Sequence, residues 1–416
     1  MARNSGQRAL SIYQVVGWLV AAGVATCVGV SSYVVANEVR APLVARQVGF
    51  PPAGIAGANA AVSIYAARVA QKRGASVTAQ EVAMARDAFR AEPLSASALS
   101  LIVSATPSGP FRNQLLSLAG RLTRRNGFLN EEQIKLAAAR GNDVAFFRWI
   151  SRSVLTNRDL RVDYVRAMAE ATARPGAVAS LTPVIGLEPS WADLYWRQVL
   201  KHPASLPNAA KLRVEIAKAP WSRSEIKPTD QALISSLVNK SQFDAAHELF
   251  AGLSQPARSR GGNLLVNADF ARQPTLAPFD WQLAMSGTLG ATVDEGQKSL
   301  VMSAIGGARG HAARQLIHLS PGSYRFAWSL SSSAPIAPSS LSARISCAEG
   351  VRSAAPIPIA LAAGNKFGTF SIADGPCRWH WLSIDVAVAD DAAGVDLRFH
   401  SLSLAAIAAT DEAHSK

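Results

Sequence analysis

The sequence predicts a multidomain protein in which one transmembrane helix is followed by an all-α domain of repeated helices and then by an antiparallel β-sandwich. Three observations predict this order. Residues 12–36 carry no charge. Apolar side chains then recur at helical spacing, with short breaks, to about residue 253. From residue 263 onward they alternate with polar ones between Gly, Pro and Ser turns. A chain of 416 residues is long enough for two or three such domains.

The uncharged run is long enough to cross a bilayer, which takes roughly 20 helical residues. Arg3 and Arg8 precede it without an acidic residue, so residues 1–11 are expected to be cytoplasmic and residues 37–416 periplasmic, on a single-pass anchor in the inner membrane. A cleaved signal peptide is the alternative. Its apolar region is usually shorter, and "VVANE" makes a poor cleavage site.

Residues 37–57 are rich in Pro and Gly and predict a spacer, and residues 58–253 predict the helical domain. Thr78 and Glu81 have the spacing of a capping box at a helix start. A break at Gly141 divides a long apolar stretch into two helices.

One segment, residues 232–253, resembles a degenerate tetratricopeptide repeat. Ile234 departs from the repeat pattern, which has a small residue there. The matching side chains are Leu233, Leu237, Phe243, Ala246 and Phe250. Stacked helix pairs of this kind form extended surfaces, so protein partners are expected on this domain.

The positive charge belongs to the helical part. Residues 37–262 hold 29 Lys and Arg against 17 Asp and Glu, whereas residues 263–416 hold 11 against 12. Arg121, Arg124 and Arg125 form a basic cluster that predicts a site for acidic polysaccharide or anionic lipid headgroups. The alternative is a solvated helix face. Nucleic acid is not expected as a partner.

A polar linker at residues 254–262 separates the helices from the predicted sandwich at residues 263–408, and residues 409–416 form a tail. Half-buried strands are predicted where apolar residues recur at every second position. The first such set is Tyr324, Phe326, Trp328 and Leu330, the second is Leu341, Ala343, Ile345 and Cys347, and the third is Val395, Leu397 and Phe399.

The stretch "NLLVNADFARQ…PFDWQL" resembles the first strands of galactose-binding-like β-sandwiches, among them carbohydrate-binding modules. The matching positions are Asn267, Asp269, Phe270 and Trp281. The resemblance implies a jelly-roll fold and a glycan ligand. Ala271 stands where such modules often have the Glu that helps hold calcium, so no metal site is predicted.

A second resemblance covers residues 130–200, where Pro189 and Trp191 carry much of the likeness. This segment resembles sphingomonad and other proteobacterial proteins that have one membrane anchor, degenerate tetratricopeptide-like helices and a C-terminal β-sandwich. The family implies this architecture and no established activity.

The strand "CRWHWLSIDVAV" (377–388) leaves two interpretations open. Strict alternation places Trp379 and Trp381 opposite the apolar face that begins at Leu382, where two exposed indoles would form a platform for sugar rings. A β-bulge near His380 would instead turn both indoles into the core.

Two of the three cysteines, Cys347 and Cys377, lie in the predicted sandwich and are expected to form a disulfide in an oxidising compartment. The alternative is two buried thiols. Cys27 lies within the anchor. No C-x-x-C motif occurs, so a structural zinc site is not expected.

No catalytic motif is present: the sequence lacks G-x-S-x-G, H-E-x-x-H and a Gly-rich phosphate loop. We therefore expect no enzyme activity and no cofactor. The expected role is that of a membrane-anchored, glycan-binding scaffold that assists the assembly or export of cell-surface or exopolysaccharide. The alternatives are a polysaccharide-processing enzyme with a cleft between its domains and a structural tether for protein interactions.

Overall fold

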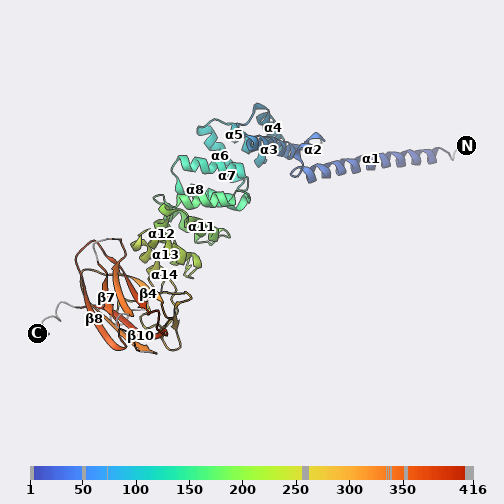
Figure 1. The fold of residues 1–416 in the computed structure, drawn as a ribbon. Helices are drawn as coiled ribbons and strands as arrows, with labels where there is room; N and C mark the ends of the chain where they lie inside the picture. The colour runs from blue at the N-terminus through green and yellow to red at the C-terminus, as the bar shows by residue number, and fades with distance from the viewer. Residues whose placement is uncertain are drawn as a thin grey trace. The chain divides into compact units, whose positions relative to one another are not determined.

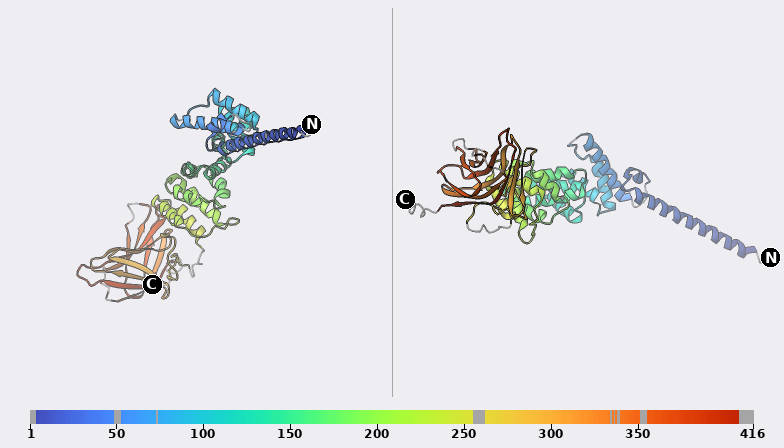
Figure 2. Two further views of the ribbon diagram at one scale, coloured as in Figure 1. Left: turned by 90° about the vertical axis from the view of Figure 1, so that its right-hand side faces the viewer. Right: turned by 60° about the horizontal axis from the view of Figure 1, so that its bottom comes forward.

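The computed structural model describes residues 4–48, 53–72, 74–254, 262–333, 335, 337, 340–350 and 355–407. The chain divides into two units, residues 1–165 and 166–416, which are described separately below. Figures 1 and 2 show helices from the N-terminus to the end of α14 and strands from there on. The order of helices before strands agrees with the fold class that the sequence predicts.

The helices follow one another closely. Their bounds are α1 Asn4–Asn37, α2 Pro42–Gln47, α3 Ala53–Gln71, α4 Ala79–Ala91, α5 Ala96–Ala105, α6 Pro110–Leu122, α7 Gly127–Ala139, α8 Asp143–Thr156, α9 Arg161–Ala171, α10 Ala177–Ile185, α11 Ala192–Val199, α12 Leu206–Ala217, α13 Pro228–Asn239 and α14 Phe243–Leu253. A short 3-10 turn, Pro203–Ser205, precedes α12.

The first helix contains the uncharged run that the sequence analysis singled out. Within α1, residues Ile12–Asn37 form the single stretch of the described chain that is long and apolar enough to cross a membrane, and a signal sequence has the same properties. The predicted spacer at residues 37–57 is wrong in part, because it contains α2 and the start of α3. Pro42 occupies the first turn of α2, where its fixed φ favours a helix and its missing N–H costs nothing.

Local signals in the first unit behave as predicted. The backbone N–H of Thr78 donates to Glu81 Oε2 at 2.7 Å, and the N–H of Glu81 donates to Thr78 Oγ1 at 3.3 Å, which completes the capping box. Gly141 has a φ of +62° between α7 and α8. Asn142 then caps α8 by accepting the N–H of Ala145 at 3.0 Å.

In the second unit, α13 and α14 form the helix pair that resembles a tetratricopeptide repeat. All five matching side chains are buried: Leu233, Leu237, Phe243, Ala246 and Phe250. An ion pair deep among α12 and α13 fixes this end of the helical part. Arg213 donates from Nε to Asp230 Oδ1 at 2.7 Å and from Nη2 to Oδ2 at 3.0 Å, and both side chains are almost fully buried.

Two five-stranded antiparallel sheets form the sandwich. The strands are β1 Gln282–Leu283, β2 Leu289–Asp294, β3 Ser299–Ala304, β4 Arg309–His318, β5 Gly322–Ser332, β6 Leu341–Cys347, β7 Ile357–Ala360, β8 Gly364–Ile372, β9 Trp379–Ala387 and β10 Val395–Ala406. Sheet A has the order β1-β4-β9-β6-β7, and sheet B has the order β2-β3-β10-β5-β8.

The core of the sandwich is one cluster of buried side chains from both sheets. The predicted apolar face of β5 is confirmed, since Tyr324, Phe326, Trp328 and Leu330 are all buried in it. In β10 the alternation is interrupted by a bulge between Phe399 and Ser401, after which Leu402 and Leu404 continue the buried face.

Removing one partner of the buried ion pair tests its role. We expect Asp230→Ala to lower the free energy of unfolding by about 3–5 kcal/mol, because it leaves the buried guanidinium of Arg213 without a counter-charge. The measurement is urea-induced unfolding followed by far-UV circular dichroism. Asp87→Ala is the control, because its pair with Arg90 is exposed to solvent and should contribute little. Equal effects of the two changes would contradict this role.

Candidate functional site

Strand β9 keeps strict alternation through both tryptophans. Its register with β6 and with β4 is unbroken around His380, and the irregularity in the β4–β9 pairing lies between His311 and Ala313. Trp379 and Trp381 therefore lie on the outer face of sheet A, opposite the buried side chain of Leu382. The alternative of a β-bulge near His380 is wrong.

Trp379 is nevertheless buried, with 3% of its surface exposed, so the expectation of an exposed indole at this position is wrong. The indole lies 6.2 Å from the ring of Phe243 and 5.3 Å from that of His247, both on α14, and 5.7 Å from Phe279. Its Nε1 donates to Asp244 Oδ1 at 2.9 Å. The last helix thus covers one end of the outer face, and these five side chains are called the Trp379 joint below.

The imidazole of His247 is part of this packing. Burial lowers the pKa of His247, and the nearby His318 lowers it further, against smaller opposing effects of Asp244 and Glu248. A neutral ring is favoured here because a charged imidazole would lose hydration on burial. Gln231 on α13 adds a second connection, since its Nε2 donates to the carbonyl of Ala277 at 2.6 Å.

Trp381 has a different environment from Trp379, because it is only half-buried. The guanidinium of Arg314 lies over its ring at 4.4 Å from the centroid. Arg314 also donates from Nε to Gln282 Oε1 at 2.9 Å. Within the described residues, no helix side chain is found in ring contact with Trp381.

Further along the same face, Asp385 connects two more strands. Its Oδ1 lies 2.5 Å from His311 Nδ1 on β4, and its Oδ2 lies 2.9 Å from Arg344 Nε on β6. We call the resulting surface the outer strip. Its members are Gln282, His311, Arg314, Arg344, Trp381 and Asp385. They give one partly accessible indole, two guanidinium groups, an amide, an imidazole and a carboxylate on one sheet face.

Sequence reasoning found Trp381 but none of the other members of the outer strip. They come from strands β1, β4, β6 and β9, so only the register between strands brings them together. The alternation within each strand was the available signal. It predicts which side chains share a face, but not which strands are neighbours.

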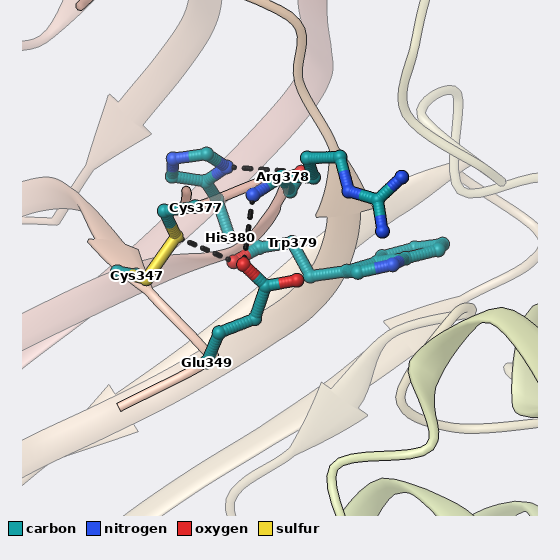
Figure 3. The surroundings of a disulfide bond; sticks show 6 residues. All are labelled: Cys347, Glu349, Cys377, Arg378, Trp379 and His380. Carbon is teal, nitrogen blue, oxygen red and sulfur yellow. Dashed lines mark hydrogen bonds between the residues drawn. A yellow bond between two sulfur atoms is a disulfide. The ribbon is translucent and has the colours of Figure 1, made fainter. Parts of the chain in front are cut away.

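Cys347 and Cys377 are joined in a disulfide, as predicted. Figure 3 shows the indole of Trp379 pointing away from the disulfide and from the imidazole of His380. The parity of Cys377 with the tryptophans is not informative, because Cys377 precedes β9 and need not follow its alternation. Cys347, Glu349 and Cys377 bring their donor atoms within 4.8 Å of one another, but both sulfurs are used in the disulfide.

A cavity of about 360 Å³ lies beside this disulfide. It is lined by Ile345, Ile357, Ile372 and His380, among others. Burial lowers the pKa of His380, and the carbonyl of Arg378 partly opposes this effect. The arrangement offers apolar walls and one mainly neutral imidazole, and it contains no pair of carboxylates among its described lining residues.

The motif residues at the start of the sandwich have structural roles. Phe270 and Trp281 are buried in the core with ring centroids 5.9 Å apart, and Trp281 Nε1 donates to the carbonyl of Asn267 at 3.2 Å. In the first unit, Arg121, Arg124 and Arg125 are all exposed at the end of α6 and in the connection to α7. Of these three, Arg124 is the one whose charge acts on Arg152 of α8, as does the charge of Arg148 on the same helix.

No family model and no curated protein matches the chain. Several solved structures match part of the chain. TmCBM61 in complex with beta-1,4-galactotriose is 11% identical, with a TM-score of 0.26, over 35% of this chain and 99% of that one. A structure described as CBM4 is 12% identical, with a TM-score of 0.23, over 30% and 94%. An arabinose-bound MgGH51 α-L-arabinofuranosidase is 17% identical, with a TM-score of 0.26, over 34% and 26%.

At these identities and TM-scores no ligand or site residue is transferred from the known structures to this chain. The resemblance to sphingomonad proteins has no counterpart among the matches and stays a prediction.

The two tryptophans of β9 should differ sharply in their effect on stability. We expect Trp379→Ala to lower the free energy of unfolding by about 3–5 kcal/mol, because it empties a buried site between α14 and sheet A. We expect Trp381→Ala to cost much less, because its ring is partly hydrated already. Urea-induced unfolding of the two variants measures the difference. A similar loss of stability in both variants would show that packing against α14 does not stabilise Trp379 more than Trp381.

Proposed function

We propose that this protein is a non-catalytic, membrane-anchored protein whose β-sandwich binds carbohydrate through the outer strip of sheet A. The observation that carries the proposal is the position of Trp381, half-buried on the face of a sheet and next to the guanidinium of Arg314. The strip lies outside the sandwich core, so its side chains are not needed to fill the interior.

The chemistry of the strip suits a sugar. A pyranose ring presents an apolar C–H face that an indole can cover, and hydroxyl groups at its rim that both donate and accept hydrogen bonds. Arg314 and Arg344 supply donors, while the exposed amide of Gln282 supplies an acceptor. Planar side chains of this kind lose little conformational freedom on binding when they already hold one another in place.

Asp385 supports binding over catalysis. Both of its oxygens already lie close to cationic or imidazole nitrogens, on Arg344 and His311. Among the members of the outer strip it is the one carboxylate, whereas glycoside hydrolysis commonly uses a pair of carboxylates. This favours a binding protein over the alternative of a polysaccharide-processing enzyme.

We further propose that the chain is anchored in the inner membrane with its bulk in the periplasm. The apolar segment Ile12–Asn37 and the positive flank of Arg3 and Arg8 support this topology. The Cys347–Cys377 disulfide supports an oxidising compartment for the sandwich. In that place, the helical domain would act as a scaffold that presents the sandwich to cell-surface or exopolysaccharide during its assembly or export.

The test compares two aromatic residues that each lie under an arginine. We expect Trp381→Ala to weaken the binding of β-linked hexose oligosaccharides to the full chain in uncharged detergent by about tenfold, which corresponds to about 1.4 kcal/mol. Phe367→Ala is the matched control. Phe367 is 58% exposed on sheet B, with Arg325 at 4.0 Å from its ring centroid. Isothermal titration calorimetry measures both affinities.

Unchanged affinity in Trp381→Ala, or equal losses in the two variants, would contradict binding at the outer strip. If the unmodified protein binds no oligosaccharide in a broad set of linkages, the structural tether becomes the better account.

A further inference from the structure

Three arginines of the first unit lie near one another, and one of them is stacked on a tryptophan. Arg148 and Arg152 lie one turn apart on α8, and Arg124 lies in the connection that follows α6. The guanidinium of Arg152 is placed over the ring of Trp149 at 4.5 Å from its centroid. We call these four residues the Arg152 cluster.

The positive charges of Arg124 and Arg148 act on Arg152. The pKa of Arg152 is lowered, first by burial and then by the positive charges of Arg124 and Arg148. Across the described residues, no carboxylate forms an ion pair with any of the three arginines. Holding like charges together costs free energy, which a bound anion would offset.

Other basic residues of this unit are paired, which makes the contrast informative. Arg68 donates to Glu81, Arg112 donates to Glu132, and Lys135 lies 2.8 Å from Glu131. Carboxylates of this unit thus pair with other basic side chains, whereas within the described residues none forms an ion pair with the Arg152 cluster. Its positive potential is open to an anion from outside the chain.

Trp149 holds Arg152 in position. The ring packs so closely on α6 that a Cβ added at Gly120 would lie 3.2 Å from the indole. With α6 on one side and the guanidinium of Arg152 on another, the indole limits the conformations of that side chain. Arg152 is half-buried, whereas Arg148 and Arg124 are exposed, so one fixed guanidinium and two exposed ones offer donors to a ligand.

We propose that the Arg152 cluster binds carboxylate groups of an acidic polysaccharide, with Arg124, Arg148 and Arg152 as ligands and Trp149 as a positioning residue. The identification of the ligand as a glycan rests on the proposed function of the sandwich. The basic site of the sequence analysis is thereby revised, because Arg148 and Arg152 take the places of Arg121 and Arg125.

The geometry favours a carboxylate chain over a membrane surface. A guanidinium presents parallel N–H donors that match the two oxygens of a carboxylate. Arg152 is half-buried and held against the ring of Trp149. This arrangement suits a single carboxylate group that enters the site. Attraction to anionic headgroups depends instead on freely exposed charge near the bilayer.

The experiment uses the full chain in nanodiscs of zwitterionic lipid and polygalacturonate as the probe. We expect Arg152→Gln to weaken binding by about tenfold or more, because hydrogen bonds between a guanidinium and a carboxylate are stronger than those between neutral groups. Arg148→Gln, on an exposed position, should weaken it as well. Arg325→Gln is the matched control. It removes the same charge from a guanidinium that also lies over an aromatic ring, and it should leave binding unchanged.

Two further measurements separate charge from position. Methyl-esterified polygalacturonate has the same backbone without the carboxylates, and we expect it to lose most of its affinity for the unmodified protein. Trp149→Leu should weaken the binding of polygalacturonate with all arginines present, and Trp149→Phe should restore it in large part, because a ring again supports Arg152.

Equal binding of the esterified and free polymers would overturn the proposal, as would unchanged affinity in both Arg148→Gln and Arg152→Gln. Co-flotation with phosphatidylglycerol vesicles that depends on Arg152, without binding of polygalacturonate, would also overturn it and identify a membrane-binding surface. Trp381→Ala separates the two sites. If Arg152→Gln weakens polygalacturonate binding and Trp381→Ala does not weaken binding of any sugar, the Arg152 cluster stands and the outer strip fails.

Discussion

The Trp379 joint is the contact on which the second unit depends. An indole at the start of β9 fills a space among Phe243 and His247 of α14 and Phe279 of the sandwich, and it donates to Asp244. Helix α14 contributes Phe243 and Phe250 to this contact, with Phe250 packed against Phe279. The sandwich covers this face of α14, so the change from helices to strands near residue 263 marks a domain that packs on α14.

The same contact divides the outer face of sheet A into two parts. Where α14 reaches, the face is buried and serves to hold the domains together. Trp381, two residues further along β9, begins the part in which Arg314, Arg344 and Asp385 surround a half-buried ring. The contact with α14 holds the sandwich at one end of this face. The other end is polar and has a fixed orientation, and it is the part of the face that we propose to bind carbohydrate.

Much of the fold could be predicted from local patterns, but little of the site could. The capping box at Thr78, the break at Gly141 and the alternation in β5 depend on neighbours in sequence, and all three are confirmed. The burial of Trp379 depends on a helix 135 residues away, which alternation cannot reveal. The predicted basic cluster likewise groups residues that are adjacent in sequence, whereas the charge of Arg124 acts on Arg152 of α8.

A double-mutant cycle between Trp379→Ala and His247→Ala tests the joint most directly. Their rings are 5.3 Å apart, and the two residues come from the sandwich and from α14. We predict that the two changes in the free energy of unfolding are non-additive by about 0.5–3 kcal/mol, as is usual for residues in contact. The cycle between Trp381→Ala and His247→Ala should be additive. Additivity in the first cycle would contradict the account that the sandwich is held on the last helix through Trp379.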